Sequence, residues 1–408
     1  MCEEELLLWA LRAGIRGEKV CWDGRLDPAS GEKLLELARD HHVQALVLDA
    51  IYGCPDFMRL DSALRTSWKQ EAKSICIRQT LRDDAFGAIW SKLEQEGIAA
   101  LVMKGCVCRN LYPNPGLRPS SDEDILVKPE DFSRALQLFR ELGITPREGE
   151  ASPDAFEVGL ISRQGLYIEL HQNPFAPGSA TVWNLEDYFD GVHNGAMQVT
   201  TAAGTVHTMS AHDHMLYLLL HAFKHFIHSG FGVRQVCDIA LWAERYGGQI
   251  RWPLLFEQCA APRCDRFAKT VFAAAAKYLG FDGEKAGIAE YLSEDLPDDA
   301  LLEDMLGAGV FGSSTGSRVH SATITLNAVE ADRKGKRSSV LRTVFPKCRD
   351  LQGRYPYLRK WPVLLPIAWC NRLGSYVLET GRKNNSAAES LDLGAKRKEL
   401  LRSLGIIK

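Results

Sequence analysis

The spacing of apolar residues changes twice along the chain, and these changes constrain the fold more than any other sequence feature. From residue 3 to residue 93, apolar side chains recur every three or four positions, as in amphipathic helices. After Gly97, short apolar runs alternate with turns and helical stretches, and from Ser210 the helical spacing returns. We therefore expect an α+β protein with an N-terminal helical region (1–96), a small mixed β-sheet core (97–209) and a C-terminal helical region (210–408).

Six segments of the middle region have the apolar character of strands. They are Ala99–Met103, Ile125–Val127, Phe156–Ile161, Tyr167–Leu170, Met197–Thr200 and Thr205–Met209. Two polar or Gly-rich stretches, Gly309–Ser317 and Arg382–Ser390, are candidate loops or linkers in the C-terminal region.

The composition excludes several classes of protein. Of the 408 residues, 46% are hydrophobic and 25% are charged, which is typical of an ordinary globular chain. The 49 basic and 52 acidic residues give a net charge of −3, so no overall positive field attracts nucleic acid or an anionic membrane. Binding to either would need a local basic patch.

The termini and the cysteines bear on location. The N-terminus carries acidic residues where a secretory signal needs positive charge, and no apolar run approaches the roughly 20 residues that cross a bilayer. The 11 cysteines include no Cys-x-x-Cys pair, which argues against a zinc ribbon. We expect a cytoplasmic protein with reduced cysteines and no membrane segment.

A strand that ends at Lys104-Gly105 precedes residues of helical character. Gly105 would let phosphate oxygens approach backbone amides at the start of a helix, and Lys104 would add a positive charge. The same dipeptide is also common in plain strand-to-helix turns, and this alternative stays open on the dipeptide alone.

Carboxylates on two strands make the signal more specific. Asp122 and Asp124 are two residues apart, so in a strand they project from one face. Glu169 follows in the strand Tyr167–Leu170 and would complete a three-acid site for two metal ions. The alternative is that both aspartates lie solvated in a loop. His171 is either a structural hydrogen-bonding residue or a participant.

The order of these residues resembles the nucleotidyltransferase superfamily with the polymerase β-like fold, and within it a bacterial group of largely uncharacterised proteins. The resemblance covers roughly residues 97–246. The residues that carry it are Lys104-Gly105, Tyr112-Pro113, Arg118, Asp122-x-Asp124 and Ile168-Glu169-Leu170-His171, with His221, Arg234 and Asp238 in the helical segment that follows.

The resemblance implies transfer of a nucleoside monophosphate from a nucleoside triphosphate, with ATP the expected donor, to an acceptor. Mg²⁺ would be held by the catalytic residues Asp122, Asp124 and Glu169, and Glu169 would help to activate the acceptor hydroxyl. We assign nucleotide binding to six residues. These are Lys104, Gly105, Arg118, Ser121, His171 and Lys224.

Two positions depart from the pattern of the superfamily. Most active members carry Gly-Ser after the first strand, where this chain has Lys104-Gly105-Cys106. The residue between the two aspartates is usually apolar, and here it is Glu123. Burying an unpaired carboxylate costs several kcal/mol, so we expect either an open strand or a partner for Glu123.

The segment Ser210–Ser229 is a predicted helix rich in histidine. His214, His221, His225 and His228 fall along one side of it. A zinc site is one interpretation, but the segment His221–His225 lacks the Glu of the HExxH motif. We favour polar packing of this helix against the catalytic face, with Lys224 or His221 near the triphosphate.

A basic segment lies near the C-terminus. Between Arg333 and Lys360 there are ten basic residues against one acid, Asp350, with Tyr355, Tyr357 and Trp361 in or beside the segment. It could hold an RNA strand by phosphate contacts and stacking, or it could be a solvated surface with aromatic anchors.

Three functions follow as hypotheses. The first is an Mg²⁺-dependent nucleotidyltransferase, supported by the three acids. The second is a nucleotide-binding or partner-binding module of the same fold without activity, suggested by the missing Gly-Ser. The third is a metallohydrolase with a histidine site. The acceptor stays open among a small molecule, a protein and RNA, and so does the oligomeric state.

Overall fold

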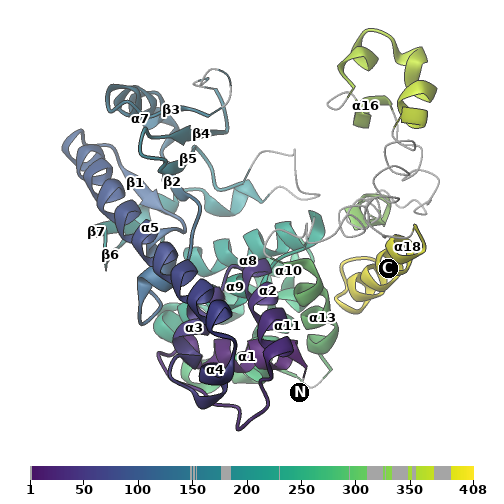
Figure 1. Ribbon diagram of the computed structural model, residues 1–408. Coiled ribbons are helices and arrows are strands. Elements are labelled where there is room, and N and C mark those ends of the chain that lie inside the picture. The colour runs from purple at the N-terminus through teal and green to yellow at the C-terminus, as the bar shows by residue number, and fades with distance from the viewer. Residues whose placement is uncertain are drawn as a thin grey trace. The chain divides into compact units, whose positions relative to one another are not determined.

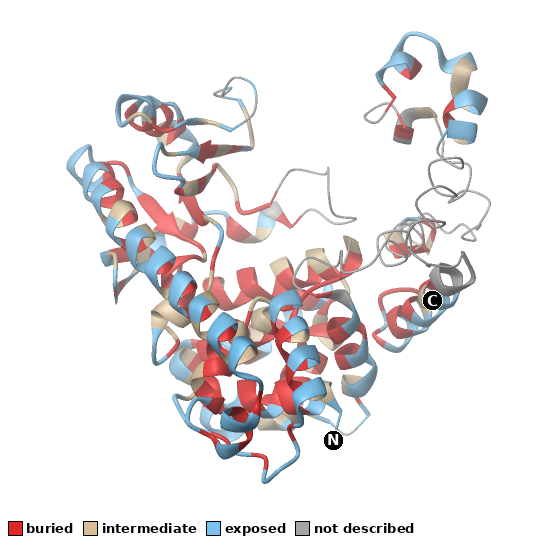
Figure 2. Cartoon of the chain, in the orientation of Figure 1, coloured by how far each residue is buried: buried red, intermediate tan, exposed pale blue. Residues whose placement is uncertain are grey.

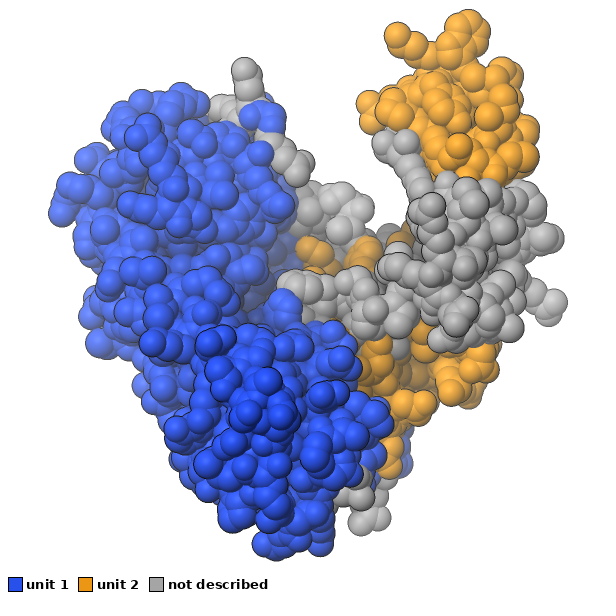
Figure 3. Space-filling view, viewed as in Figure 1, with its two compact units in different colours: residues 1–222, 233–296 blue, residues 223–232, 297–408 orange. Residues whose placement is uncertain are grey.

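The structure is a computed structural model that describes residues 2–147, 149, 152, 154–175, 185–228, 230–293, 295–309, 325–326, 328–332, 348–351, 355–371 and 387–408. Contacts divide the chain into two compact units, residues 1–222 with 233–296 and residues 223–232 with 297–408 (Figure 3). The division into three regions stays a prediction. Residues 310–317 and 382–386 of the candidate linkers, and most of the basic segment 333–360, lie outside the described residues. Residues 387–390 of the second candidate linker are helical and begin α18.

Helices form the first part of the chain, as its apolar spacing predicts. Asp27 caps the second of them by accepting a hydrogen bond from the backbone N–H of Ser30, and Pro28 stands at its first position. Asp61 caps the long fifth helix in the same way. The helices are α1 (Glu3–Gly14), α2 (Pro28–Asp40), α3 (Gln44–Ile51), α4 (Pro55–Arg59) and α5 (Ser62–Gln95).

A five-stranded mixed sheet follows α5 (Figure 1). Its strand order is β1-β2-β5-β4-β3, and β2 and β5 are parallel while the other neighbours are antiparallel. The strands are β1 (Ala100–Val102), β2 (Glu123–Val127), β3 (Thr145–Pro146), β4 (Glu157–Ile161) and β5 (Tyr167–His171). A two-stranded sheet, β6 (Met197–Thr201) with β7 (Gly204–Thr208), is separate.

The six predicted strands are all present, with ends shifted by at most two residues. Only β3 was not predicted, because two residues are too few to show an apolar pattern. The α+β expectation, a small mixed sheet flanked by helices, is therefore confirmed.

Strand β2 is buried on both faces. All five residues of β2 are buried, and α7 (Pro129–Glu141) contributes Phe132 and Phe139 to the core (Figure 2). The short helix α6 (Cys106–Arg109) follows β1 and is buried throughout. The sequence of a strand that is buried on both faces is usually a continuous apolar run, so a charged residue within it needs a specific partner.

The remaining described helices follow β7. Within the described residues, none of the helices is long and apolar enough to cross a membrane. In the second unit, Leu351, Tyr355, Leu358 and Ala368 form a small core of their own. The helices are α8 (Ala211–His228), α9 (Val233–Tyr246), α10 (Trp252–Ala260), α11 (Asp265–Leu279), α12 (Gly283–Ala286), α13 (Asp298–Ala308), α16 (Cys348–Leu351) and α18 (Ala387–Ser403).

Candidate active site

The pairing of β2 with β5 brings two acids together. Asp124 is the register partner of Glu169 on the neighbouring parallel strand, so both side chains project from the same face. His171 follows two residues later on that face. One ligand atom from each of Asp124, Glu169 and His171 lies within 4.8 Å of the other two.

Asp124 is enclosed by positive and polarisable groups. Its side chain is 2% exposed, Lys104 Nζ lies 3.3 Å from its Oδ2, and His171 Nε2 lies 3.7 Å from its Oδ1. Burial alone would favour the neutral acid, but Lys104 and His171 outweigh it and hold the pKa of Asp124 well below its usual range. Asp124 is therefore ionised at neutral pH.

Glu169 is more open and electrostatically different. Its side chain is 25% exposed, and His171 Nε2 lies 3.7 Å from its Oε2. Burial, followed by the carboxylates of Asp124, Asp122 and Glu157, raises the pKa of Glu169 to about 8. The pKa values of these two neighbouring carboxylates are thus shifted in opposite directions, a pattern that is common in functional sites.

Glu123 contacts the backbone of the turn that follows β1. The Glu123 carboxylate is fully buried, accepts a hydrogen bond from the Cys106 backbone N–H at 2.8 Å, and lies 2.7 Å from the Arg109 guanidinium. Arg109 also pairs with Asp83 of α5. We expected Glu123 either to face solvent or to have a partner, and the structure shows that it has partners.

Gly105 is required at this turn. Its φ of +56° is a conformation that L side chains rarely adopt, and a Cβ there would lie 1.9 Å from Glu123 Oε2. Glycine therefore lets the backbone between Lys104 and Cys106 lie directly against the buried carboxylate.

A small cavity of about 60 Å³ adjoins the turn. Its charged lining residues are Lys104, Arg118, Asp122, Arg234 and Asp238. Asp238 accepts hydrogen bonds from the Arg118 Nε at 3.1 Å and from the Tyr112 hydroxyl at 2.8 Å. Lys104 follows β1, Arg118 and Asp122 precede β2, and Arg234 and Asp238 lie on α9. Together they form a compact polar site beside the acids.

The donor set suits a divalent cation. Asp124 and Glu169 offer carboxylate oxygens, which hard ions such as Mg²⁺ prefer, while the His171 nitrogen suits softer metals. The buried Asp124 Oδ2 lies 3.3 Å from Lys104 Nζ, so a metal ion at this oxygen would share it with the Lys104 ammonium. Among the described residues, this is the one group of three or more His, Cys, Asp or Glu side chains arranged to hold a metal.

A family model described as an uncharacterised nucleotidyltransferase matches residues 27–280, more than half of the chain. The chain belongs to this nucleotidyltransferase family. The resemblance noted from the acid pattern is thereby confirmed. No curated protein and no solved structure showed a match.

The assigned nucleotidyltransferase residues occupy different positions in the structure. Asp122 lies outside the group of three candidate metal ligands and lines the cavity next to Lys104. Ser121 is exposed and is not a lining residue, whereas its neighbour Ser120 lines the cavity. Lys224 belongs to the second compact unit, so its role stays a prediction.

Sequence reasoning assigned no role to several residues that surround the site. Arg109 pairs with both Glu123 and Asp83, and Arg234 lines the cavity with Gln235. Arg234 appears in the residue order shared with the superfamily, and that was the only signal for it. Asp83 gave no signal, because a single acid in a long helix is usually on a solvated face.

The histidines of α8 have two distinct environments in the first unit. His214 Nδ1 lies 2.8 Å from Thr208 Oγ1, and its ring stacks on Trp242 with centroids 3.9 Å apart. His221 Nε2 lies 3.1 Å from Lys104 Nζ. The predicted helix is confirmed, and these contacts agree with polar packing against the catalytic face. In the described part of the chain, no metal-binding group of three includes a histidine of α8.

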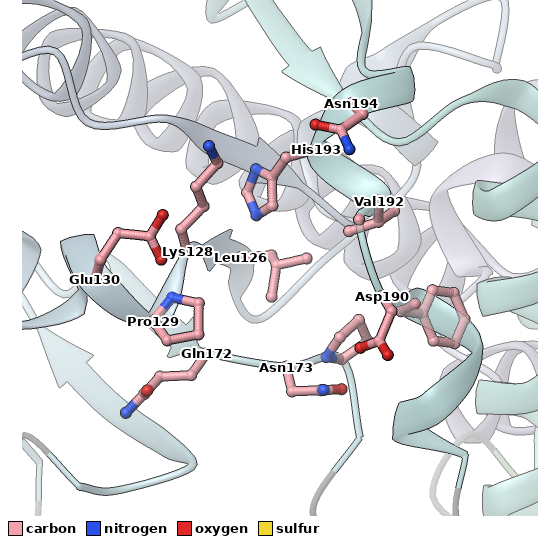
Figure 4. Close-up of a pocket in the computed structure, with 13 residues that line it drawn as sticks. Leu126, Lys128, Pro129, Glu130, Gln172, Asn173, Asp190, Val192, His193 and Asn194 are labelled. Carbon is pink, nitrogen blue, oxygen red and sulfur yellow. The ribbon is translucent and has the colours of Figure 1, made fainter.

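A second cavity, of about 250 Å³, lies past the carboxyl ends of β2 and β5 (Figure 4). Figure 4 shows the side chains of Lys128, Gln172, Asn173, Asp190 and His193 around it. Leu126, two residues beyond Asp124 on the same face of β2, also lines it. The acids therefore lie between this cavity and the Lys104 turn along the two strands.

Proposed function

We propose that the protein is a divalent-metal-dependent nucleotidyltransferase that moves a nucleoside monophosphate from a nucleoside triphosphate, with ATP the expected donor, to an acceptor hydroxyl. The observation that carries the proposal is the register of Asp124 with Glu169 on adjacent parallel strands, with Lys104 3.3 Å from Asp124. A pair of carboxylates beside a cationic turn is the arrangement that phosphoryl transfer needs.

In this proposal, Asp124 and Glu169 hold Mg²⁺ with Asp122 beside them. The bound ion would neutralise charge on the α-phosphate and on the leaving pyrophosphate. Lys104 and the backbone at Gly105 position the phosphates over the acids. Because Asp124 is buried and fixed by Lys104 and His171, its orientation is set before substrate binds.

The reaction balances without a further reagent. The acceptor oxygen forms a bond to the α-phosphorus, and the bond from that phosphorus to the α,β-bridging oxygen breaks. Pyrophosphate carries away the electron pair of the broken bond. A divalent cation held beside Glu169 would favour its ionised form, and this partly exposed carboxylate is then the group placed to accept the proton of the acceptor hydroxyl.

The direct test replaces Asp124 by Asn, which removes a ligand charge and little volume. ATP affinity in the presence of Mg²⁺ should fall by at least about tenfold, equivalent to about 1.4 kcal/mol. Isothermal titration with Mg²⁺ or with EDTA measures this. Asp131→Asn is the matched control, because it removes a carboxylate from a surface pair with Arg134.

Loss of the Lys104 partner could also weaken the fold, and a double variant separates the two effects. Asp124→Asn with Lys104→Gln removes both members of the ion pair. The readout is Mg²⁺ binding without nucleotide, because Lys104 is itself proposed to contact phosphate. If the role of Asp124 is structural, the double variant should recover stability and Mg²⁺ binding. If Asp124 holds metal, Mg²⁺ binding should stay lost.

One observation favours a second candidate, a nucleotide-binding module without transfer activity. The Lys104 ammonium already lies beside Asp124, where a fixed cation competes with a metal ion. In such a module ATP would bind equally well with Mg²⁺ and with EDTA. The same titration therefore distinguishes the two candidates.

A further inference from the structure

Three cations line the cavity beside the Lys104 turn, and they differ in their partners. Lys104 pairs with Asp124, and Arg118 pairs with Asp238. Arg234 has no carboxylate within ion-pair distance in the described part of the chain. Its recorded hydrogen bond runs from Nη1 to the backbone carbonyl of Pro119 at 2.6 Å.

The surroundings of Arg234 are unfavourable to an uncompensated charge. Burial, followed by the neighbouring Arg118 guanidinium, lowers the pKa of Arg234 to about 10. Its Nε is buried and makes no hydrogen bond, and the same is true of Oε1 of the adjacent Gln235. A guanidinium with spare donors in a cavity is a group arranged to meet an anion.

The cavity has room for one small anion. A water molecule needs about 10–15 Å³ of such space, so about 60 Å³ accommodates four to six waters or one phosphate group. It is too small for a nucleoside. Asp122 also lines it and would repel an anion unless a cation sits on the acids.

We propose that Arg234 binds the terminal phosphate of the triphosphate in this cavity and makes the protein select nucleoside triphosphates over diphosphates. This inference deepens the proposed function and rests on it for the identity of the nucleotide. The phosphate chain runs from the acids at Asp124, past Lys104, to the planar guanidinium of Arg234. A diphosphate held at the acids would lack the phosphate that Arg234 binds.

The test compares ATP, ADP and inorganic tripolyphosphate by isothermal titration in Mg²⁺. The unmodified protein should bind ATP at least about tenfold more tightly than ADP, since a charge-assisted contact to phosphate is lost with ADP. Arg234→Gln should bind ATP and ADP with equal affinity and should lose tripolyphosphate. An unchanged preference for ATP in Arg234→Gln would overturn the proposal.

Matched variants exclude a structural explanation. Arg245→Gln changes an arginine of the same helix that contacts Asn110 and Tyr246 outside the cavity, and the preference for ATP should survive there. Arg234→Gln breaks no ion pair and removes one hydrogen bond, to the Pro119 carbonyl, so the melting temperature should fall only slightly. Arg234→Lys, which keeps the charge and loses the planar fork, should retain part of the preference. A fall in melting temperature with the preference intact would mark Arg234 as structural.

The outcomes separate this inference from the proposed function. If Asp124→Asn leaves Mg²⁺-dependent ATP binding unchanged while Arg234→Gln abolishes tripolyphosphate binding, the transferase proposal fails and the anion site stands. If Asp124→Asn abolishes binding and Arg234→Gln retains the preference for ATP, only the anion site fails.

Discussion

At the scale of single residues, Glu123 connects the buried interior to the turn that would meet phosphate. It stands between Asp122 and Asp124 but projects to the opposite face of β2, where Arg109 and the Cys106 N–H receive it. Burial raises the pKa of Glu123, so its charge depends on these partners. The side chain therefore fixes the position of the Lys104–Cys106 backbone.

Gly105→Ala tests this arrangement. The substitution adds backbone strain of about 1–3 kcal/mol and a Cβ that lies 1.9 Å from Glu123 Oε2, so the turn must move. We expect loss of ATP binding as well as stability, measured by titration and by urea unfolding. Gly97→Ala has a φ of +65° and nothing within 4 Å of the added Cβ, so it isolates the strain. Equal ATP affinity in both variants would contradict the role of the turn.

The sequence predicted residue roles where chemistry and spacing were local. Asp124, Glu169 and the Lys104-Gly105 turn were recognisable because each follows from a strand pattern and a short spacing. The buried ion pairs around Glu123 were not recognisable, because Asp83 lies in α5 and only the tertiary fold brings it to Arg109. Arg234 is also far from Lys104 in the sequence, because strands β2 to β7 lie between them, although both residues line the same cavity.

At the scale of elements, His214 joins three of them. Thr208 Oγ1 at the end of β7 donates to the Val102 carbonyl of β1 at 2.6 Å, and it accepts from Nδ1–H of His214 on α8. The other ring nitrogen is buried without a hydrogen bond. Burial lowers the pKa of His214 to about 3, so the imidazole is neutral in the folded protein.

This histidine predicts a pH dependence of stability. The unfolded side chain binds a proton near its ordinary pKa of 6.5 and the folded one only near 3, so acid favours unfolding. The free energy of unfolding should fall as the pH drops from about 6.5 toward 3, by up to about 1.4 kcal/mol per pH unit from this group.

Urea unfolding between pH 7.5 and pH 5 measures the effect. His214→Phe keeps a ring against Trp242 and removes the titrating group, so its stability should depend less on pH than that of the unmodified protein. Identical slopes in the two proteins would show that His214 does not contribute.

The elements themselves were largely predictable. Strand positions followed from short apolar runs, and the helices from three- and four-residue spacing and their caps. The order of strands in the sheet was not predictable, because the parallel pairing of β2 with β5 joins segments that are separated in the sequence by α7, β3 and β4. That pairing is what places Glu169 beside Asp124.

At the scale of the whole molecule, the family match and the compact units nearly coincide. The family model ends at residue 280, and the first unit ends at residue 296. All residues of the proposed metal and phosphate sites belong to that first unit. Apart from residues 223–232, the family match lies within the first unit, so chemistry shared with the family is expected there.

The central claim is transfer of the nucleoside monophosphate, and the fate of a label in ATP tests it most directly. The purified protein is incubated with Mg²⁺, a cell extract as acceptor source, and ATP labelled at either the α- or the γ-phosphorus. The account predicts that the α-label enters an acceptor, that the γ-label leaves as pyrophosphate, and that Asp124→Asn stops both. Transfer of the γ-label to the acceptor, or its release as inorganic phosphate without incorporation of the α-label, would contradict the account.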